Sequence, residues 1–274
     1  MRRASLLAKR YRAELTFVHV VDDDQPDEIV RLERAEATRY LSQQVSSFEE
    51  FRGVRCEVLV TTGDAFDGIL NAADNVSADL IVMGSHRKQL LRDVFVGTTI
   101  ERVVRTGMFP VLMVNSDTAL ATGEQLDYRY VMAATDMSEP SAHAIRSARA
   151  LGFLEDATVA IVHAFSAVAR GKLYLADIAR EQIEEYAASE RNQVRTEMIA
   201  FLMEQGFDSL ARSLLVEEGR VLEVISQVVA ERKPDLLVIG THGRSGIMKM
   251  LLGSVAEEIL RNSEIDILVV PRPR

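Results

Sequence analysis

Short, continuously apolar runs alternate with longer amphipathic stretches along the second half of the chain. The runs are rich in β-branched residues and predict strands, whereas the stretches between them predict helices. Because the runs do not alternate apolar and polar positions, both faces of their sheet should be covered, as in an α/β fold with a doubly wound parallel sheet. The expected strands are "YVMAAT" (130–135), "ATVAIVHA" (157–164), "ARSLLV" (211–216), "DLLVIG" (235–240) and "DILVV" (266–270).

The amphipathic stretches carry apolar residues at helical spacing, and several have recognisable ends. Ser138 suits the N-cap of the first predicted helix, with Pro140 in its first turn. Gly206 suits the left-handed position that follows the long second helix. The predicted helices cover residues 138–151, 173–205, 221–232 and 254–262.

The first half of the chain repeats motifs of the second half in the same order. "ADLIVMGSH" (78–86) resembles "PDLLVIGTH" (234–242), and the spacing from Gly63 to Gly84 equals that from Gly219 to Gly240. Such self-similarity predicts two tandem copies of one structural unit, joined by a polar stretch. The expected units are residues 1–116 and 127–274.

The two copies do not match at their beginnings. Aligning His19 with His163 places Met1 opposite Ile145, so nothing in the first copy corresponds to Asp127–Ala144. That segment holds the first strand of the second copy, and we expect the first unit to lack this strand. We therefore expect that the natural gene begins upstream of Met1, or that the first unit is a damaged scaffold or borrows a strand.

Composition narrows the class of protein. The chain has 274 residues, 47% of them apolar, and a net charge of −9, which argues against a nucleic-acid surface as its main activity. No run of about 18 apolar residues occurs, so no membrane span is expected. Cys56 is the single cysteine, which excludes an internal disulfide, predicts a cytoplasmic protein and suggests buried packing for its side chain.

A glycine-rich loop follows the fourth strand of the second unit, "GTHGRSGIMKMLLGS" from Gly240 to Ser254. In doubly wound sheets, ligands bind beyond the carboxyl ends of the strands. Glycines permit a positive φ and let backbone amides approach a ligand, and the helix that begins after Gly253 attracts anions. The loop therefore suits phosphates, with a flexible crossover followed by a capped helix as the alternative.

The pattern Gly240-x2-Gly243-x9-Gly253-Ser254 resembles the ATP-binding signature of the universal stress protein family. The segments "ATDMS" (134–138), "VHA" (162–164) and "ILVVPR" (267–272) agree with that family. The resemblance covers nearly the whole chain as two tandem copies, with the ATP-binding motif in the second. It implies adenine nucleotide alpha hydrolase-like domains with five-stranded sheets in the order 3-2-1-4-5. It also implies an adenine nucleotide, ATP or else AMP or ADP, with Mg²⁺ left open and no metal ligands assigned.

The resemblance also implies roles for individual residues. Asp136 and the backbone of Ala164 would hold adenine, although Asp136 can instead begin a turn or cap the next helix. His242 would act through its backbone rather than as a catalytic imidazole, and no catalytic residue is assigned. His19 and His163 are interpreted as packed structural residues. Contacts with ribose and phosphates are implied for Gly240, Thr241, His242, Gly243, Gly253, Ser254 and Val255.

Several function classes lack their motifs. The sequence has no G-x4-G-K-[ST] loop, no G-x-S-x-G elbow and no G-x-G-x-x-G after the first strand of the second unit. The favoured function is a nucleotide-dependent stress-response sensor that acts through conformation or an unknown protein partner. A slow ATPase or self-phosphorylating enzyme is the alternative, and a scaffold of the same fold without nucleotide is a third possibility.

The first unit departs from the signature at Arg87, where a glycine is expected. A long side chain there would stand where phosphate oxygens approach, so we expect one nucleotide per chain, in the second unit. Two alternatives stay open: the guanidinium mimics or recruits an anion, or the helix start after Gly97 holds a lone phosphate.

The last strand of each unit is short and apolar, "PVLMV" (110–114) and "DILVV" (266–270). In the implied order this strand lies at the sheet edge, and an apolar edge favours pairing with another strand. We expect the two edges to pair antiparallel within one chain, as an internal pseudo-dimer. Exchange between two chains, giving a homodimer, is the alternative.

Overall fold

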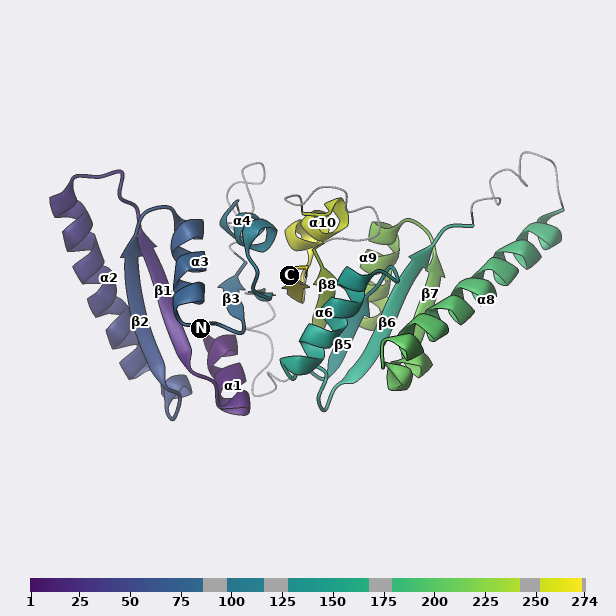
Figure 1. Cartoon of the computed structure of the whole chain (residues 1–274), viewed down its shortest axis with the longest axis horizontal. Helices are drawn as coiled ribbons and strands as arrows, with labels where there is room; N and C mark the ends of the chain where they lie inside the picture. Colours follow the sequence, from purple (N-terminus) through teal and green to yellow (C-terminus); the bar gives the residue numbers. More distant parts are fainter. Residues whose placement is uncertain (86–97, 116–127, 168–178, 242–251, 273–274) are drawn as a thin grey trace. The chain divides into compact units, whose positions relative to one another are not determined.

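The chain forms two compact units, Met1–Asp127 and Tyr128–Arg274. The structure is a computed structural model and describes residues 1–85, 98–115, 128–167, 179–241 and 252–272 (Figure 1). Within these ranges no helix has the length and apolar character needed to cross a membrane.

The second unit is built on a parallel sheet in which β5 occupies the centre. β5 pairs with β6 on one side and with β8 on the other, β6 pairs with β7, and β8 pairs with β9. The order along the sheet is therefore β7-β6-β5-β8-β9. The strands are β5 (Tyr130–Ala134), β6 (Thr158–Phe165), β7 (Leu214–Glu218), β8 (Leu236–Gly240) and β9 (Asp266–Val270).

Helices cover both faces of this sheet, which confirms the predicted α/β fold. α6 packs against β8 and β9, α8 against β7, α9 against β6, and α10 against α9 (Figure 1). Right-handed crossovers place α6 and α8 on one face and α9 and α10 on the other. The central residues Val131, Met132 and Ala133 of β5 are fully buried as a result. The helices are α6 (Glu139–Ala150), α8 (Arg180–Glu204), α9 (Val221–Arg232) and α10 (Ser254–Asn262).

The region after α8 corrects the predicted start of the third strand. Residues from Ala211 were expected to be extended, but a 3-10 helix, η2 (Asp208–Ser213), precedes β7, which begins at Leu214. Gly206 takes the left-handed conformation expected of it, with φ 72°. Phe207 is fully buried directly afterwards, and its carbonyl accepts a hydrogen bond from the Leu210 N–H at 2.9 Å. Because Phe207 is buried and the chain turns directly after it, residues 208–213 form η2 and the extended segment begins only at Leu214.

The first unit holds two separate parallel strand pairs, β1 with β2 and β3 with β4. Among the described residues of this unit, no strand joins β1 to β3. The elements are α1 (Arg2–Tyr11), β1 (Leu15–Val21), α2 (Asp27–Ser47), η1 (Glu49–Phe51), β2 (Cys56–Thr62), α3 (Ala65–Asn75), β3 (Ile81–Gly84), α4 (Thr98–Thr106) and β4 (Val111–Val114).

α3 is held closely against the first strand pair. A Cβ at Gly68 would lie 2.7 Å from a methyl group of Val20, so only glycine permits this approach of helix to strand. Asp64 caps the helix by accepting a hydrogen bond from the Phe66 N–H at 2.9 Å. The hydrogen bond that its carboxylate accepts from Arg102 of α4, at 2.8 Å, is the main cause that lowers the pKa of Asp64.

Two packing expectations for the first unit are wrong. His19 was expected to be packed like His163, but it is exposed, whereas His163 is buried. Cys56 is only half-buried rather than enclosed, and burial still raises the pKa of its thiol. Both residues lie in the pair β1–β2, which lacks a neighbouring strand on the β1 side among the described residues.

Candidate functional site

The candidate site lies at the carboxyl edge of the second sheet, where β5 and β8 end side by side. From β5 the chain continues to β6 and β7 on one side of β5. It then returns through α9 to β8, which lies on the other side of β5. The helices on either side of such a reversal leave a crevice beyond the strand ends, and ligands of doubly wound sheets bind there. Ala133 of β5 lies opposite Val238 of β8, so both strands deliver their last residues to this edge.

Asp136 shapes the turn that follows β5. Its Oδ1 accepts hydrogen bonds from the Ser138 N–H at 3.1 Å and from the Ser138 hydroxyl at 2.5 Å. Met137 between them has φ 62°, and its N–H donates to the Thr135 hydroxyl oxygen at 3.2 Å. The turn role considered for Asp136 is therefore present in the structure, and it fixes the carboxyl group at the edge of the sheet.

Buried hydrogen bonds from β6 and α6 hold this turn in place. Nδ1 of His163 lies 2.7 Å from the carbonyl oxygen of Thr135. A carbonyl only accepts, so Nδ1 carries the hydrogen of this bond. The hydroxyls of Thr135 and Ser141 are hydrogen-bonded at 2.8 Å, and both side chains are buried. His163 is thus a packed structural residue, as expected, and it ties β6 to the Asp136 turn.

Ala164 directs its backbone towards the same turn. The carbonyl of Val162, two residues earlier, accepts a hydrogen bond from the Thr135 N–H at 3.0 Å, so Val162 faces β5. Backbone groups of a strand point to the same side at every second residue. The N–H and carbonyl of Ala164 therefore point to the β5 side, beyond Ala134, the last residue of β5 that pairs with β6.

The two ends of the glycine-rich loop are joined. The carbonyl of Thr241, just after β8, accepts a hydrogen bond from the Gly253 N–H at 2.9 Å. The Thr241 N–H donates in turn to the Val270 carbonyl of β9 at 3.0 Å, and the Thr241 side chain is buried. The loop thus leaves the sheet and returns to it at one point, where α10 begins beside the end of β8.

The start of α10 has the properties of an anion site. The first amides of a helix lack partners within the helix and carry its positive dipole end. Gly253 is the N-cap residue and offers no side chain as a cap, Ser254 is exposed, and Val255 is half-buried. The backbone of Gly253 has φ −61° and ψ 141°, which any residue adopts. The positive φ that the sequence suggested for the glycines of this loop is therefore not required at Gly253.

The structure thus gathers most of the predicted contact residues at one edge. Asp136 and Ala164 lie at the ends of neighbouring strands, and Gly240, Thr241 and Gly253–Val255 lie around the joined loop ends. Sequence reasoning missed Thr135 and Ser141, although hydroxyl residues just after a buried strand are a usable signal for a supported turn. Four predicted positions lie outside the described residues: Arg87, Gly97, His242 and Gly243.

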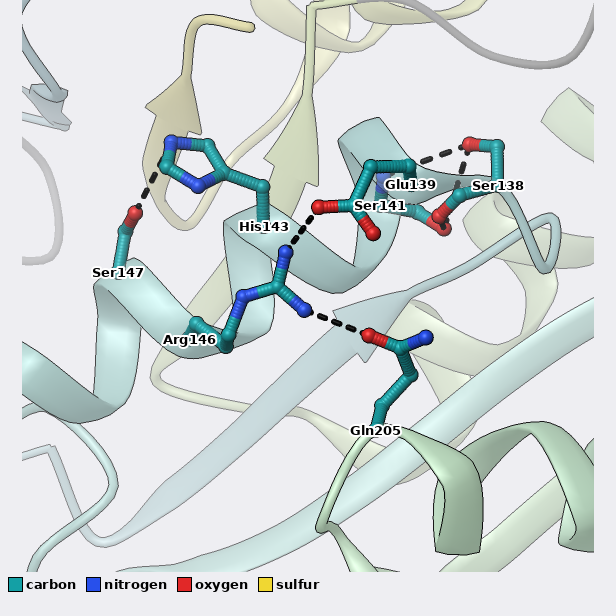
Figure 2. Close-up of polar contacts among 7 residues, drawn as sticks. All are labelled: Ser138, Glu139, Ser141, His143, Arg146, Ser147 and Gln205. Carbon is teal, nitrogen blue, oxygen red and sulfur yellow. Dashed lines mark hydrogen bonds and ion pairs between the residues drawn. The ribbon is translucent and has the colours of Figure 1, made fainter. Parts of the chain in front are cut away.

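Polar side chains line the exposed side of α6 directly after the Asp136 turn (Figure 2). Glu139 forms an ion pair with Arg146, which also donates to the Oε1 atom of Gln205 at 2.6 Å. Further along the helix, Nε2 of His143 lies 3.5 Å from the hydroxyl of Ser147. These contacts anchor α6, and through it the turn, to the end of α8.

The pKa of His143 is expected below its ordinary value of 6.5 because burial disfavours the imidazolium and Arg146 repels it, with Glu139 opposing both. The unfolded chain then binds the proton more readily, so the free energy of unfolding should fall as the pH drops from 6.5 through the lowered pKa. NMR titration of the imidazole measures this: Arg146→Gln should raise the pKa and Glu139→Gln should lower it further. A wild-type pKa at or above 6.5 would contradict the assignment.

Candidate metal ligands among the described residues are confined to the first unit. The carboxylates of Asp22, Asp23 and Asp24 lie within 4.8 Å of one another, and all three residues are exposed. This cluster follows β1 of the first unit and is not part of the edge just described.

A model of the universal stress protein family matches residues 1–115 and 127–271. A universal stress protein of Mycobacterium tuberculosis is 25% identical over 266 residues, which cover 93% of this chain and 86% of that protein. One of Methanocaldococcus jannaschii is 40% identical over 57 residues, 21% of this chain and 34% of that relative. The crystal structure of a universal stress protein from Archaeoglobus fulgidus has a TM-score of 0.67 at 19% identity, covering 99% of this chain and 94% of that one. At that identity the likeness shows the fold alone.

Proposed function

This chain belongs to the universal stress protein family, and we propose that its second unit binds one adenine nucleotide. The hydrogen bond between Thr241 and Gly253 is the observation that carries the proposal, because it sets the start of α10 beside the end of β8. Phosphate oxygens would accept from the amides of Ser254 and Val255, while Gly253, whose N–H already donates to Thr241, would contribute by allowing the phosphates to approach. This arrangement binds an anion without requiring a cluster of basic side chains.

The base and ribose would lie beyond the carboxyl ends of β5 and β6, where doubly wound sheets bind their ligands. The N–H and carbonyl of Ala164 suit the ring edge of adenine, which offers a donor and an acceptor side by side. The carboxylate of Asp136, held by Ser138, would accept from the exocyclic amine or from a ribose hydroxyl. Gly240, Thr241, His242 and Gly243 would contact the ribose and phosphates, as the family signature implies.

Asp136→Asn tests the base contact while preserving the turn, because the amide oxygen can still accept from Ser138. We expect the dissociation constant for ATP to rise about tenfold, since one charge-assisted hydrogen bond is lost. Calorimetry on the full chain with ATP, ADP and AMP measures it. Asp208→Asn, an exposed carboxylate at the start of η2, is the matched control. Equal affinities for both variants would remove Asp136 from the site.

We favour a sensor over an enzyme. The carboxylate of Asp136 is engaged by Ser138, and the Nδ1–H of His163 is engaged by the Thr135 carbonyl. Neither group is poised as a general base towards a ligand beyond the strand ends, among the residues that the structure describes. Nucleotide binding would then act through conformation or a protein partner. Measurable ATP turnover or self-phosphorylation that is lost when Gly253 is substituted would favour the alternative enzyme.

Three expectations remain proposals. The domain limits 1–116 and 127–274 lie close to the division of the chain after Asp127. Pairing of the outer strands, within one chain or between two chains, is proposed from their apolar character alone. A cytoplasmic setting is proposed from the single cysteine, Cys56.

A further inference from the structure

Thr135, the residue directly after β5, is held through its backbone and its side chain. Its N–H donates to the Val162 carbonyl at 3.0 Å, and its carbonyl accepts from Nδ1 of His163 at 2.7 Å. Its hydroxyl is hydrogen-bonded at 2.8 Å to that of Ser141 in α6, and both side chains are buried. The position of Thr135 is therefore set by β6 and α6, without any ligand.

The partners of the two buried hydroxyls show where their hydrogens lie. The Ser141 hydroxyl is 2.8 Å from the Ser138 carbonyl, which only accepts, so Ser141 donates to it. Because this uses the single hydroxyl hydrogen of Ser141, Thr135 donates to the Ser141 oxygen. The oxygen of Thr135 in turn accepts from the Met137 N–H at 3.2 Å. A methyl group in place of the Thr135 hydroxyl would remove both hydrogen bonds.

The backbone of Met137 needs this support. Its φ of 62° lies in the left-handed region, which costs free energy in a residue that has a Cβ. The bond from its N–H to the Thr135 hydroxyl stabilises the turn locally. The Ser138 N–H then donates to Oδ1 of Asp136 at 3.1 Å. The orientation of the carboxylate thus depends on the backbone of Met137, and that backbone depends on the hydroxyl of Thr135.

The turn also decides what kind of group a ligand can place here. The N–H groups of Met137 and Ser138 are engaged by side chains of the turn itself. The Ser141 N–H donates to the Ser138 hydroxyl at 3.4 Å (Figure 2), and Pro140 has no N–H. The start of α6 therefore offers a carboxylate instead of a row of free donors. A ligand meets it through a donor such as an amine or a hydroxyl, and not through phosphates.

We propose that Thr135 is a positioning residue of the nucleotide site, and that Ser141 holds Thr135 in place. Thr135 keeps Met137 in its left-handed conformation and thereby presents the carboxylate of Asp136 to a donor group of the adenosine moiety. The identity of the ligand rests on the proposed function. The dependence of the turn on Thr135 does not, because it is a property of the chain alone.

Hydrogen exchange measured by NMR on the full chain, without nucleotide, tests the dependence of the turn. Thr135→Val replaces the hydroxyl by a methyl group of similar size. The amide of Ser138, whose own acceptor Asp136 is unchanged, should exchange at least about tenfold faster in this variant. Thr135→Ser keeps the hydroxyl and should exchange like the wild type. An unchanged Ser138 amide in Thr135→Val would overturn the proposal, because the turn would then stand without Thr135.

Titration with adenosine and with ATP tests the effect on the site. Thr135→Val should weaken both ligands by the same factor of about five, because the affected contact lies at the base or ribose. In a chain that already carries Asp136→Ala, Thr135→Val should change the affinity less than about twofold, because the group it positions is gone. An equal loss in both backgrounds would overturn the proposal, since Thr135 would then act without Asp136.

Two further variants complete the test. Ile145→Val removes a buried methylene one turn further along α6, and it should lower stability while leaving both measurements unchanged. Ser141→Ala removes the acceptor of the Thr135 hydroxyl and should give smaller changes in the same direction; it replaces Thr135→Val if that variant does not fold. A wild-type chain that binds neither adenosine nor ATP would contradict the proposed function, and the exchange of Ser138 would still decide whether Thr135 holds the turn.

Discussion

Gly253→Asp is expected to weaken ATP binding at least about 100-fold while leaving the second unit as stable as before, or slightly more stable. The φ of −61° at Gly253 accepts any residue, so the substitution introduces no backbone strain. Aspartate is a preferred N-cap residue, and its carboxylate would accept from the first amides of α10. The phosphates would then meet occupied donors and a like charge.

Gly253→Asn separates these two causes, because its amide oxygen caps the helix without a charge. We expect it to weaken binding less than the aspartate does. Calorimetry measures affinity, and hydrogen exchange of the second unit measures stability. Unchanged ATP affinity in Gly253→Asp would place the phosphates elsewhere.

Leu237→Ala is expected to lower the stability of the second unit by about 2–5 kcal/mol, because it removes a fully buried side chain and leaves a cavity. Leu237 is 1% exposed in β8, the strand that delivers Gly240 and Thr241 to the candidate site. Apparent ATP affinity should fall only as far as the folded fraction falls. The two units need not unfold together, so amide exchange in the second unit against urea concentration is the suitable measurement.

Leu32→Ala is the matched control for this substitution. Leu32 lies on α2 of the first unit and is 68% exposed, so its truncation removes little packing. We expect a change within about 0.5 kcal/mol. If Leu237→Ala were equally mild, the placement of β8 in the core of the sheet would be wrong.

The local pattern of apolar and polar residues predicted the strands and helices around the site well. α10 and β9 have the predicted bounds, because a glycine precedes the helix and a compact apolar run forms the strand. Ser138 is the N-cap of α6, and its hydroxyl accepts from the Ser141 N–H at 3.4 Å. The start of β7 was predicted three residues early because the burial of Phe207, which sets the preceding turn, is a tertiary effect.

The neighbouring strands determine the burial and the hydrogen bonds of a side chain, which the local sequence pattern does not predict. His19 and His163 stand at equivalent positions in similar sequences, yet only His163 has β5 beside it and is buried. The sequence predicted Asp136 at the strand end, but its bonds with Ser138 depend on the left-handed backbone of Met137. The sequence similarity of the two units therefore predicts their helices and strands well. It does not predict how deeply each side chain is buried.

Titration of ATP into the isotope-labelled full chain, followed by amide NMR, tests the central claim most directly. We expect one nucleotide per chain, with the largest shifts at Ala164, Thr241 and Gly253–Val255 and small shifts in the first unit. Two equal sites, or the largest shifts in residues 1–115, would contradict it.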